Sequence, residues 1–113
     1  MKIVDRKTFM QLPTGTMFQK YTPEICEELC IKDSNLLDID FWYYCIDGIH
    51  AVDGDDDVQV SDMLYQAERD GQSFNSDLRV VSRDGCFDQD QLFLIWEPAD
   101  VAKLVDLITN RCQ

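Results

Sequence analysis

The stretch FWYYCIDGIHAV, residues 41–52, decides the fold of this chain. An aromatic run is followed by Asp47-Gly48 and a second apolar run, and an Asp-Gly pair favours a type I′ turn because both central residues need φ > 0. The sequence therefore predicts a β-hairpin. Its opposed residues are Ile46 and Ile49, Cys45 and His50, and Tyr44 and Ala51. Both faces of this hairpin are largely apolar, which places it in the middle of a sheet.

The hairpin lies inside an acidic segment. Between Asp33 and Glu68 the chain has ten carboxylates and no Lys or Arg. The net charge of −12 is uneven: residues 1–23 carry four bases and one acid, a net +3, whereas residues 24–113 carry six bases and twenty-one acids, a net −15. Such a field repels nucleic acid and anionic membranes and attracts basic proteins or cations. Solubility alone is the other explanation of the same charge.

Length and composition indicate one domain, residues 1–113, with 45% hydrophobic residues and a core that needs no metal or disulfide. No apolar stretch approaches the roughly 20 residues of a membrane span, and the N-terminus has no signal-peptide core, so a cytoplasmic location is expected. The five cysteines form no regular framework, which favours reduced thiols. A zinc site would need ligands gathered from distant positions, and no cofactor is expected.

Local patterns predict the remaining elements. Strands are expected at residues 2–4, 16–21, 29–32, 78–81 and 91–96, with a turn at 33–35. Helices are expected after an Asp5 cap, at residues 62–70 between a Ser61 cap and Gly71, and from Pro98 onward. The fold class is α+β: a mostly antiparallel sheet of about four to six strands, a C-terminal helix packed on one face, and two shorter helices. The expected core residues are Trp42, Tyr44, Phe93, Ile95 and Leu104.

Few side chains suggest catalysis. Cys45 opposite His50 is the candidate nucleophile and base, but a buried thiol beside a structural histidine fits the same pattern. The acidic run from Asp53 to Asp57 fails as a calcium loop, because Val58 and Leu64 occupy the positions of the required Gly and Glu. Asp84, Asp88 and Asp90 form a second acidic group, which is a candidate site for a divalent cation.

The opening MKIVDRKTF, with LPTGT at residues 12–16, resembles small uncharacterised acidic proteins of enterobacterial bacteriophages. RDGCFD at residues 83–88 and DQLF at 90–93 extend the resemblance over most of the chain. These motifs mark turns, so they supply no catalytic residue. The resemblance implies a phage accessory protein that acts on host machinery in the host cytoplasm.

Together these observations predict a small non-enzymatic protein that inhibits or modulates a host protein with a basic, nucleic-acid-binding surface, without direct contact to nucleic acid or membrane. The acidic binding surface is expected on two loops, with the residues Asp53, Asp55, Asp56, Asp57, Asp84, Asp88 and Asp90. Two alternatives remain open. One is an enzyme that uses Cys45 and His50, or a metal at Asp84, Asp88 and Asp90, and the other is an immunity-type antidote to a toxin.

Overall fold

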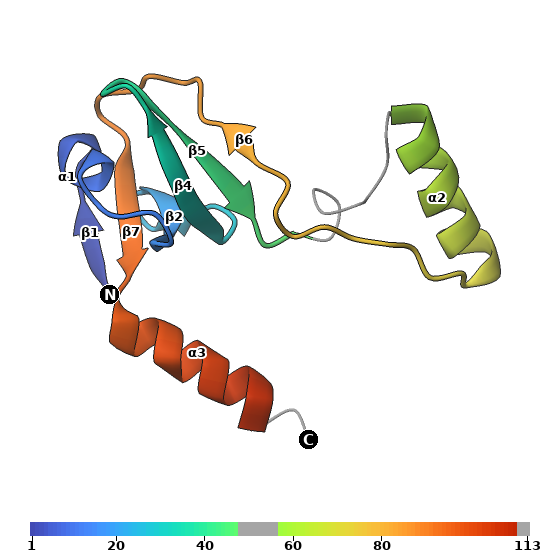
Figure 1. Ribbon diagram of the computed structural model, residues 1–113. Coiled ribbons are helices and arrows are strands. Elements are labelled where there is room, and N and C mark those ends of the chain that lie inside the picture. The colour runs from blue at the N-terminus through green and yellow to red at the C-terminus, as the bar shows by residue number, and fades with distance from the viewer. Residues whose placement is uncertain (48–56, 111–113) are drawn as a thin grey trace.

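The computed structural model describes residues 1–47 and 57–110, and these form an antiparallel sheet with three helices (Figure 1). The strands are β1 (Lys2–Val4), β2 (Met17–Thr22), β3 (Ile25–Cys26), β4 (Cys30–Leu36), β5 (Asp40–Cys45), β6 (Ser82–Arg83) and β7 (Leu92–Trp96). The helices are α1 (Arg6–Met10), α2 (Asp57–Asp70) and α3 (Pro98–Asn110). The predicted α+β class is confirmed.

The sheet has the strand order β1-β7-β2-β4-β5-β6, and β3 pairs with β2. Every pairing among the described strands is antiparallel. The aromatic strand β5 forms a hairpin with the preceding β4, in which Cys30 lies opposite Cys45 and Tyr44 lies opposite Ile31. The second strand of the hairpin predicted around Asp47-Gly48 lies outside the described residues.

The turn predicted at residues 33–35 is wrong. Strand β4 continues through residues 33–35 to Leu36, and its register with β5 is irregular between Lys32 and Asn35. The chain reverses only at residues 37–39, where Leu37 adopts a positive φ of 54°. Polar residues such as Ser34 favour turns, but they tolerate an extended backbone when a neighbouring strand provides hydrogen bonds. Here the pairing of β4 with β5 overrides the turn preference.

The core is a cluster of phenylalanine rings on one face of the sheet. Phe9, from α1, stacks on Phe93 with ring centroids 4.0 Å apart, and meets the edges of Phe18 and Phe41 at 4.7 and 4.9 Å. All four rings are at most 1% exposed. The short helix that carries Phe9 begins as predicted, because the carboxylate of Asp5 accepts a hydrogen bond from the Thr8 backbone N–H at 2.8 Å.

The predicted core is therefore correct only in part. Phe93 and Ile95 are buried, whereas Trp42, Tyr44 and Leu104 are half-buried and lie outside the core cluster. In β5 the residues of the opposite parity, Phe41 and Tyr43, face α1. Because side chains alternate along a strand, choosing the wrong face of an entirely apolar strand exchanges every core residue.

Helices α2 and α3 both differ from the prediction. Helix α2 begins at Asp57, so Ser61 lies inside it, and it is longer than α3. It ends as predicted at Gly71, which has φ 69° and donates its N–H to the Ala67 carbonyl. Helix α3 extends from the end of the sheet and has no buried residue, so the predicted packing on a sheet face is wrong (Figure 1). None of the described helices is long and apolar enough to cross a membrane.

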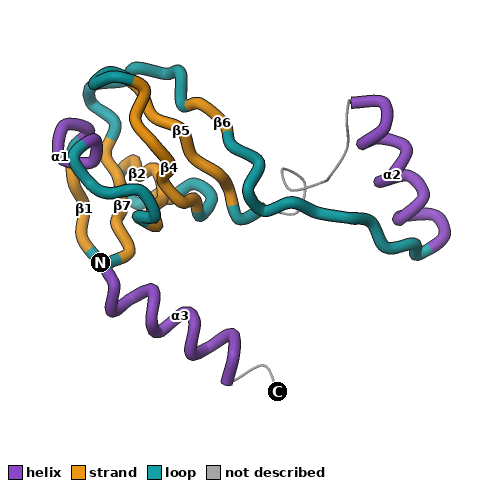
Figure 2. The backbone as a smooth tube through the Cα atoms, viewed as in Figure 1, coloured by secondary structure: helices purple, strands orange, loops and turns teal. Residues whose placement is uncertain are grey.

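The strand predicted at residues 78–81 is also wrong. These residues belong to a long exposed connection between α2 and β6 (Figure 2), and only Ser82 and Arg83 pair with β5. Val80 and Val81 favour a strand by their shape, but a β-strand also requires a neighbouring strand to pair with.

Replacing Phe9 by Ala should destabilise the fold by about 3–5 kcal/mol, because it removes the ring that all the other core phenylalanines contact. Urea unfolding followed by circular dichroism measures the change. Phe74→Ala is the control, since Phe74 is 40% exposed, and it should change the free energy of unfolding by less than about 1 kcal/mol. Equal effects of the two variants would contradict a core centred on Phe9.

Candidate functional site

The predicted acidic group at Asp84, Asp88 and Asp90 is divided in the structure. The Asp84 side chain is 1% exposed, whereas Asp88 and Asp90 are exposed on the loop that leads to β7. Asp88 Oδ1 accepts a hydrogen bond from the Asp90 backbone N–H at 2.9 Å. Within residues 1–47 and 57–110, no three His, Cys, Asp or Glu side chains gather as ligands for a metal ion. The three carboxylates therefore do not form the cluster that the alternative metal site requires.

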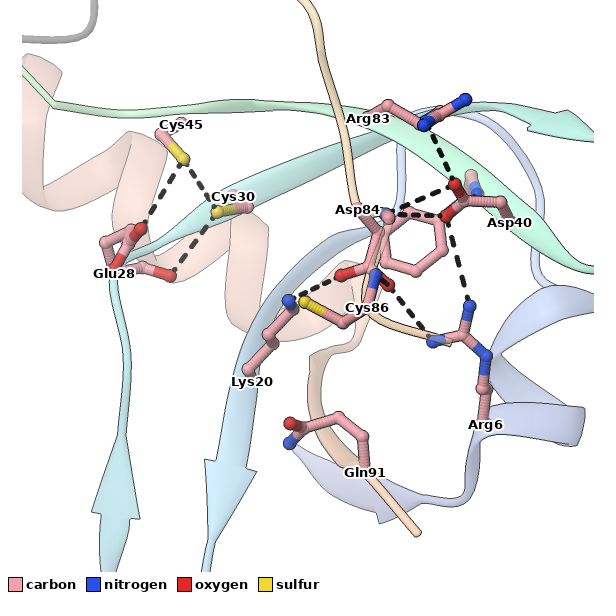
Figure 3. A network of polar contacts seen from close by, with 12 residues as sticks. Arg6, Lys20, Glu28, Cys30, Asp40, Cys45, Arg83, Asp84, Cys86 and Gln91 are labelled. Carbon is pink, nitrogen blue, oxygen red and sulfur yellow. Dashed lines mark hydrogen bonds and ion pairs between the residues drawn. The ribbon is translucent and has the colours of Figure 1, made fainter. Parts of the chain in front are cut away.

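Asp84 instead lies between two cations inside the fold (Figure 3). Its Oδ2 is 3.2 Å from Arg6 Nη1, and its Oδ1 is 2.5 Å from Lys20 Nζ. The Arg6 side chain is 5% exposed and that of Lys20 is 20% exposed. The Asp84 backbone N–H donates to the Phe41 carbonyl at 3.0 Å. The Asp84 carboxylate thus joins α1 to β2, and its backbone N–H ties the same residue to the start of β5.

A second carboxylate, Asp40, extends this network and is fully buried. It accepts hydrogen bonds from the backbone N–H groups of Phe41, at 2.9 Å, and Gly85, at 3.1 Å. Arg83 Nε lies 3.3 Å from its Oδ2, and Arg6 Nη2 lies 4.0 Å from its Oδ1. Buried charges are tolerated only when they are paired and hydrogen-bonded, and both aspartates meet this condition. We call Arg6, Lys20, Asp40, Arg83 and Asp84 the charge network.

The network determines the protonation of Asp84. Burial by itself would raise the pKa of this carboxyl, but the ion pairs with Lys20 and Arg6 outweigh it and hold the pKa below its usual range. Asp84 therefore stays ionised at neutral pH, although water does not reach it. Its charge is balanced within the fold and is unavailable to a partner, so Asp84 does not belong to the predicted acidic binding surface.

One local signal for this network was present in the sequence. In the predicted strand at residues 16–21, Lys20 shares the face of Phe18, so a lysine in that position indicates a polar partner such as an acid. The identity of the acid could not be read locally, because Arg6 and Asp84 are 78 residues apart.

A pair of thiols lies close to the network. Cys30 and Cys45 face each other across β4 and β5 with their sulfur atoms 3.2 Å apart, and Glu28 Oε1 lies 3.8 Å from Cys45 Sγ (Figure 3). Burial, and then the hydrogen bond with Cys45, raise the pKa of Cys30. Burial raises the pKa of Cys45 too, and the negative charge of Glu28 raises it further. A nucleophilic cysteine needs the opposite, a lowered pKa, so this environment disfavours a catalytic Cys45.

Several predicted site residues lie outside the described residues. These are His50, the proposed base for Cys45, and the acidic residues Asp53, Asp55 and Asp56. Asp57 is the first residue of α2. The pairing of Cys30 with Cys45 was not predicted, because the sequence indicated two strands but not their register.

The chain matches no protein-family model, and comparisons with curated proteins and with solved structures likewise give no match. The resemblance to phage proteins therefore stays a prediction.

Replacing Asp84 by Asn should destabilise the protein by about 3–5 kcal/mol at pH 7, because Arg6 and Lys20 lose their shared anion while remaining buried. The folded pKa of Asp84 is lowered, so its stabilisation is present above the unfolded pKa of about 3.9 and is lost as pH falls through the folded value. The difference between wild type and variant, measured by urea unfolding, should therefore shrink as pH falls below about 4. Asp90→Asn is the exposed control, and a similar loss in both would disprove the special role of Asp84.

The buried Cys30 and the half-buried Cys45 should react more slowly with iodoacetamide at pH 7 than the exposed Cys26 and Cys86. A raised pKa lowers the thiolate fraction at neutral pH, so both thiols should be alkylated after Cys26 and Cys86. Mass spectrometry of the alkylated, digested protein gives a rate for each cysteine. Alkylation of Cys45 before the exposed cysteines would instead support the enzyme alternative.

Proposed function

We propose that this protein is a non-enzymatic acidic binding protein that inhibits or modulates a partner with a basic, nucleic-acid-binding surface. The observation that carries the proposal is that the protein buries or pairs several of its own basic side chains. Arg6 and Lys32 are at most 4% exposed, and Lys20 is held in an ion pair with Asp84.

Because these cations are buried or paired, the remaining charges show a larger excess of acids over bases than the whole sequence does. Removing the three bases and their two buried acids, Asp40 and Asp84, from the count leaves seven bases against twenty acids. Few of the remaining bases oppose the exposed carboxylates, so the field outside the protein is strongly negative. Such fields raise association rates with oppositely charged partners by roughly 10- to 1,000-fold at low salt.

The exposed acids lie on segments that are free to approach a partner. In the described chain these include Glu24 in the β2–β3 turn, Glu27 just after β3, helix α2 with Glu68 and Asp70, and the loop with Asp88 and Asp90. Carboxylates spaced along exposed loops resemble the phosphates of a nucleic acid strand in charge. A basic groove that normally holds phosphates would therefore accept them, and the predicted phage origin would make that partner a host protein.

The raised pKa values of Cys30 and Cys45 also favour binding over catalysis, because both thiols are poor nucleophiles at neutral pH.

The partner should be recovered by pull-down from enterobacterial lysate with the immobilised protein, followed by elution in a salt gradient. We expect a nucleic-acid-binding protein that is released as salt rises, because the Debye length shortens from about 10 Å at 0.1 M to about 3 Å at 1 M. Nuclease treatment of the lysate should not abolish its recovery. If nothing salt-sensitive is retained, the acidity serves solubility alone.

A variant with Asp55, Asp56 and Asp57 replaced by Asn should associate with that partner about three- to tenfold more slowly at low salt. Its free energy of unfolding should change by less than about 1 kcal/mol, because a run of like charges contributes little to folding. The matched control makes the same charge change on α2, with Asp62→Asn, Glu68→Gln and Asp70→Asn. Slower association of the first variant alone assigns binding to residues 55–57, and equal slowing assigns it to the overall field. Unchanged rates in both would contradict the proposal.

A further inference from the structure

The two faces of the sheet are covered very differently. One face carries the phenylalanine core under α1. The alternate residues of the same strands form the opposite face, which we call the open face: Met17, Ile31, Trp42, Tyr44, Leu94 and Trp96. Each of these six side chains is half-buried, and none reaches the burial of the core phenylalanines. Among the described elements, α1 lies on the other face, α2 stands away from the sheet and α3 extends from its end (Figure 1).

The composition of the open face is that of an interface. These six residues are apolar or aromatic, although 28% of the chain is charged, and the charged Arg83 lies opposite Trp42 on the edge strand β6. The polar Gln19 between them accepts a hydrogen bond from Trp96 Nε1 at 3.1 Å. An antiparallel sheet with a solvated face normally carries polar side chains there, and Trp, Tyr and Met are the residues enriched where proteins meet.

Helix α3 is the second uncovered apolar element. Its apolar residues recur at helical spacing, and Val105 and Ile108 are 52% and 56% exposed. A groove of about 220 Å³ between Trp96, Leu104 and Leu107 joins this stripe to the open face.

The corner between β7 and α3 keeps the helix away from its own sheet. Only Glu97 separates Trp96 from Pro98, the first residue of α3. The N-terminal ammonium of Met1 lies 2.8 Å from Asp100 and 3.2 Å from Glu97, and the Asp100 carboxylate accepts the Glu97 N–H at 2.9 Å. These contacts fix the direction in which α3 leaves the sheet, so Val105 and Ile108 stay exposed and do not cover the open face of the same chain.

The accessible surface and the radius of gyration of the molecule also indicate surface that a partner could cover. Its accessible surface is 7968 Å², whereas a folded monomer of 13.1 kDa exposes about 6,400 Å². Its radius of gyration is 16.3 Å, against about 13 Å for a compact chain of this length. The excess of about 1,600 Å² includes the exposed surface of α2 and of the connection after it, and it is twice the roughly 800 Å² that each chain contributes to a standard dimer interface.

We propose that the open face is the interface of a homodimer in which α3 of each copy packs across the sheet of the other. The dimensions agree: a 13-residue helix is about 20 Å long, and five strands from β1 to β5 span about 19 Å. In a dimer with a two-fold axis, the helix of each copy covers the sheet face of the other, so both uncovered elements are buried together. This inference rests on packing and is independent of the acidic binding function.

Sedimentation equilibrium tests the dimer directly. The wild type should have twice the mass of 13.1 kDa at micromolar concentration. Replacing Val105 and Ile108 by Gln should give a monomer with unchanged helical circular dichroism, because both residues are exposed in one chain and Gln favours a helix more than they do. The matched control, Val58→Gln with Tyr65→Gln on α2, should remain a dimer. A wild type that is monomeric at about 100 μM would overturn the proposal.

Salt separates this association from binding to a basic partner. Two chains of charge −12 repel each other, so added salt should tighten the dimer, whereas it should weaken a complex with a basic protein. A dimer that dissociates as salt rises would contradict an apolar interface between two acidic chains.

Tryptophan fluorescence then tests whether the open face is the part that is covered. The chain has two tryptophans, Trp42 and Trp96, and both lie on this face. Their emission should shift to longer wavelength as the wild type is diluted, and should be at longer wavelength at all concentrations in the α3 variant. Emission independent of concentration in a protein that does dimerise would place the interface elsewhere. Short-wavelength emission from a monomer would mean that α3 covers its own sheet. Either result overturns the proposal.

Discussion

The ion pairs of Asp84 with Arg6 and Lys20 are the interaction on which the rest of the structure depends. The three side chains come from α1, from β2 and from the connection between β6 and β7, so one carboxylate holds together segments that are far apart in sequence. Asp40 adds the backbone of Gly85 to the same region. The phenylalanine rings form the core beside this network, and loss of the ion pairs would leave Arg6, Asp40 and Asp84 buried as unpaired charges.

The network also explains the uneven charge of the sequence. The first 23 residues carry a net +3, and two of their four bases, Arg6 and Lys20, pair with an acid from the last third of the chain. The basic N-terminal segment therefore neutralises acid inside the fold, and the outside of the molecule is more acidic than the sequence alone suggests. A charge of this size leaves few surfaces on which two copies can meet, and the largely apolar open face is one of them.

Local signals in the sequence predicted much of the fold. Asp5, Gly71 and Pro98 act within a few residues of their helix ends, so their effects could be read correctly. The face that β5 turns toward the core could not be read, because both of its faces are apolar and only the position of Phe9 decides between them. The candidate site was the least predictable part. Asp84, Asp88 and Asp90 look alike in the sequence, and a pairing with Arg6 across 78 residues separates the first from the others.

The central claim is that Asp84 and Asp40 anchor the connection after β6 to the core instead of serving as exposed acids. Amide hydrogen exchange measured by NMR tests this most directly. The amides of Asp84 and Gly85 donate to the Phe41 carbonyl and to the Asp40 carboxylate. If the network is as stable against local unfolding as the core, both amides should exchange only through global unfolding, as slowly as the Phe93 amide. Exchange as fast as that of the exposed Gln72 would show that the connection opens locally, and would contradict the account.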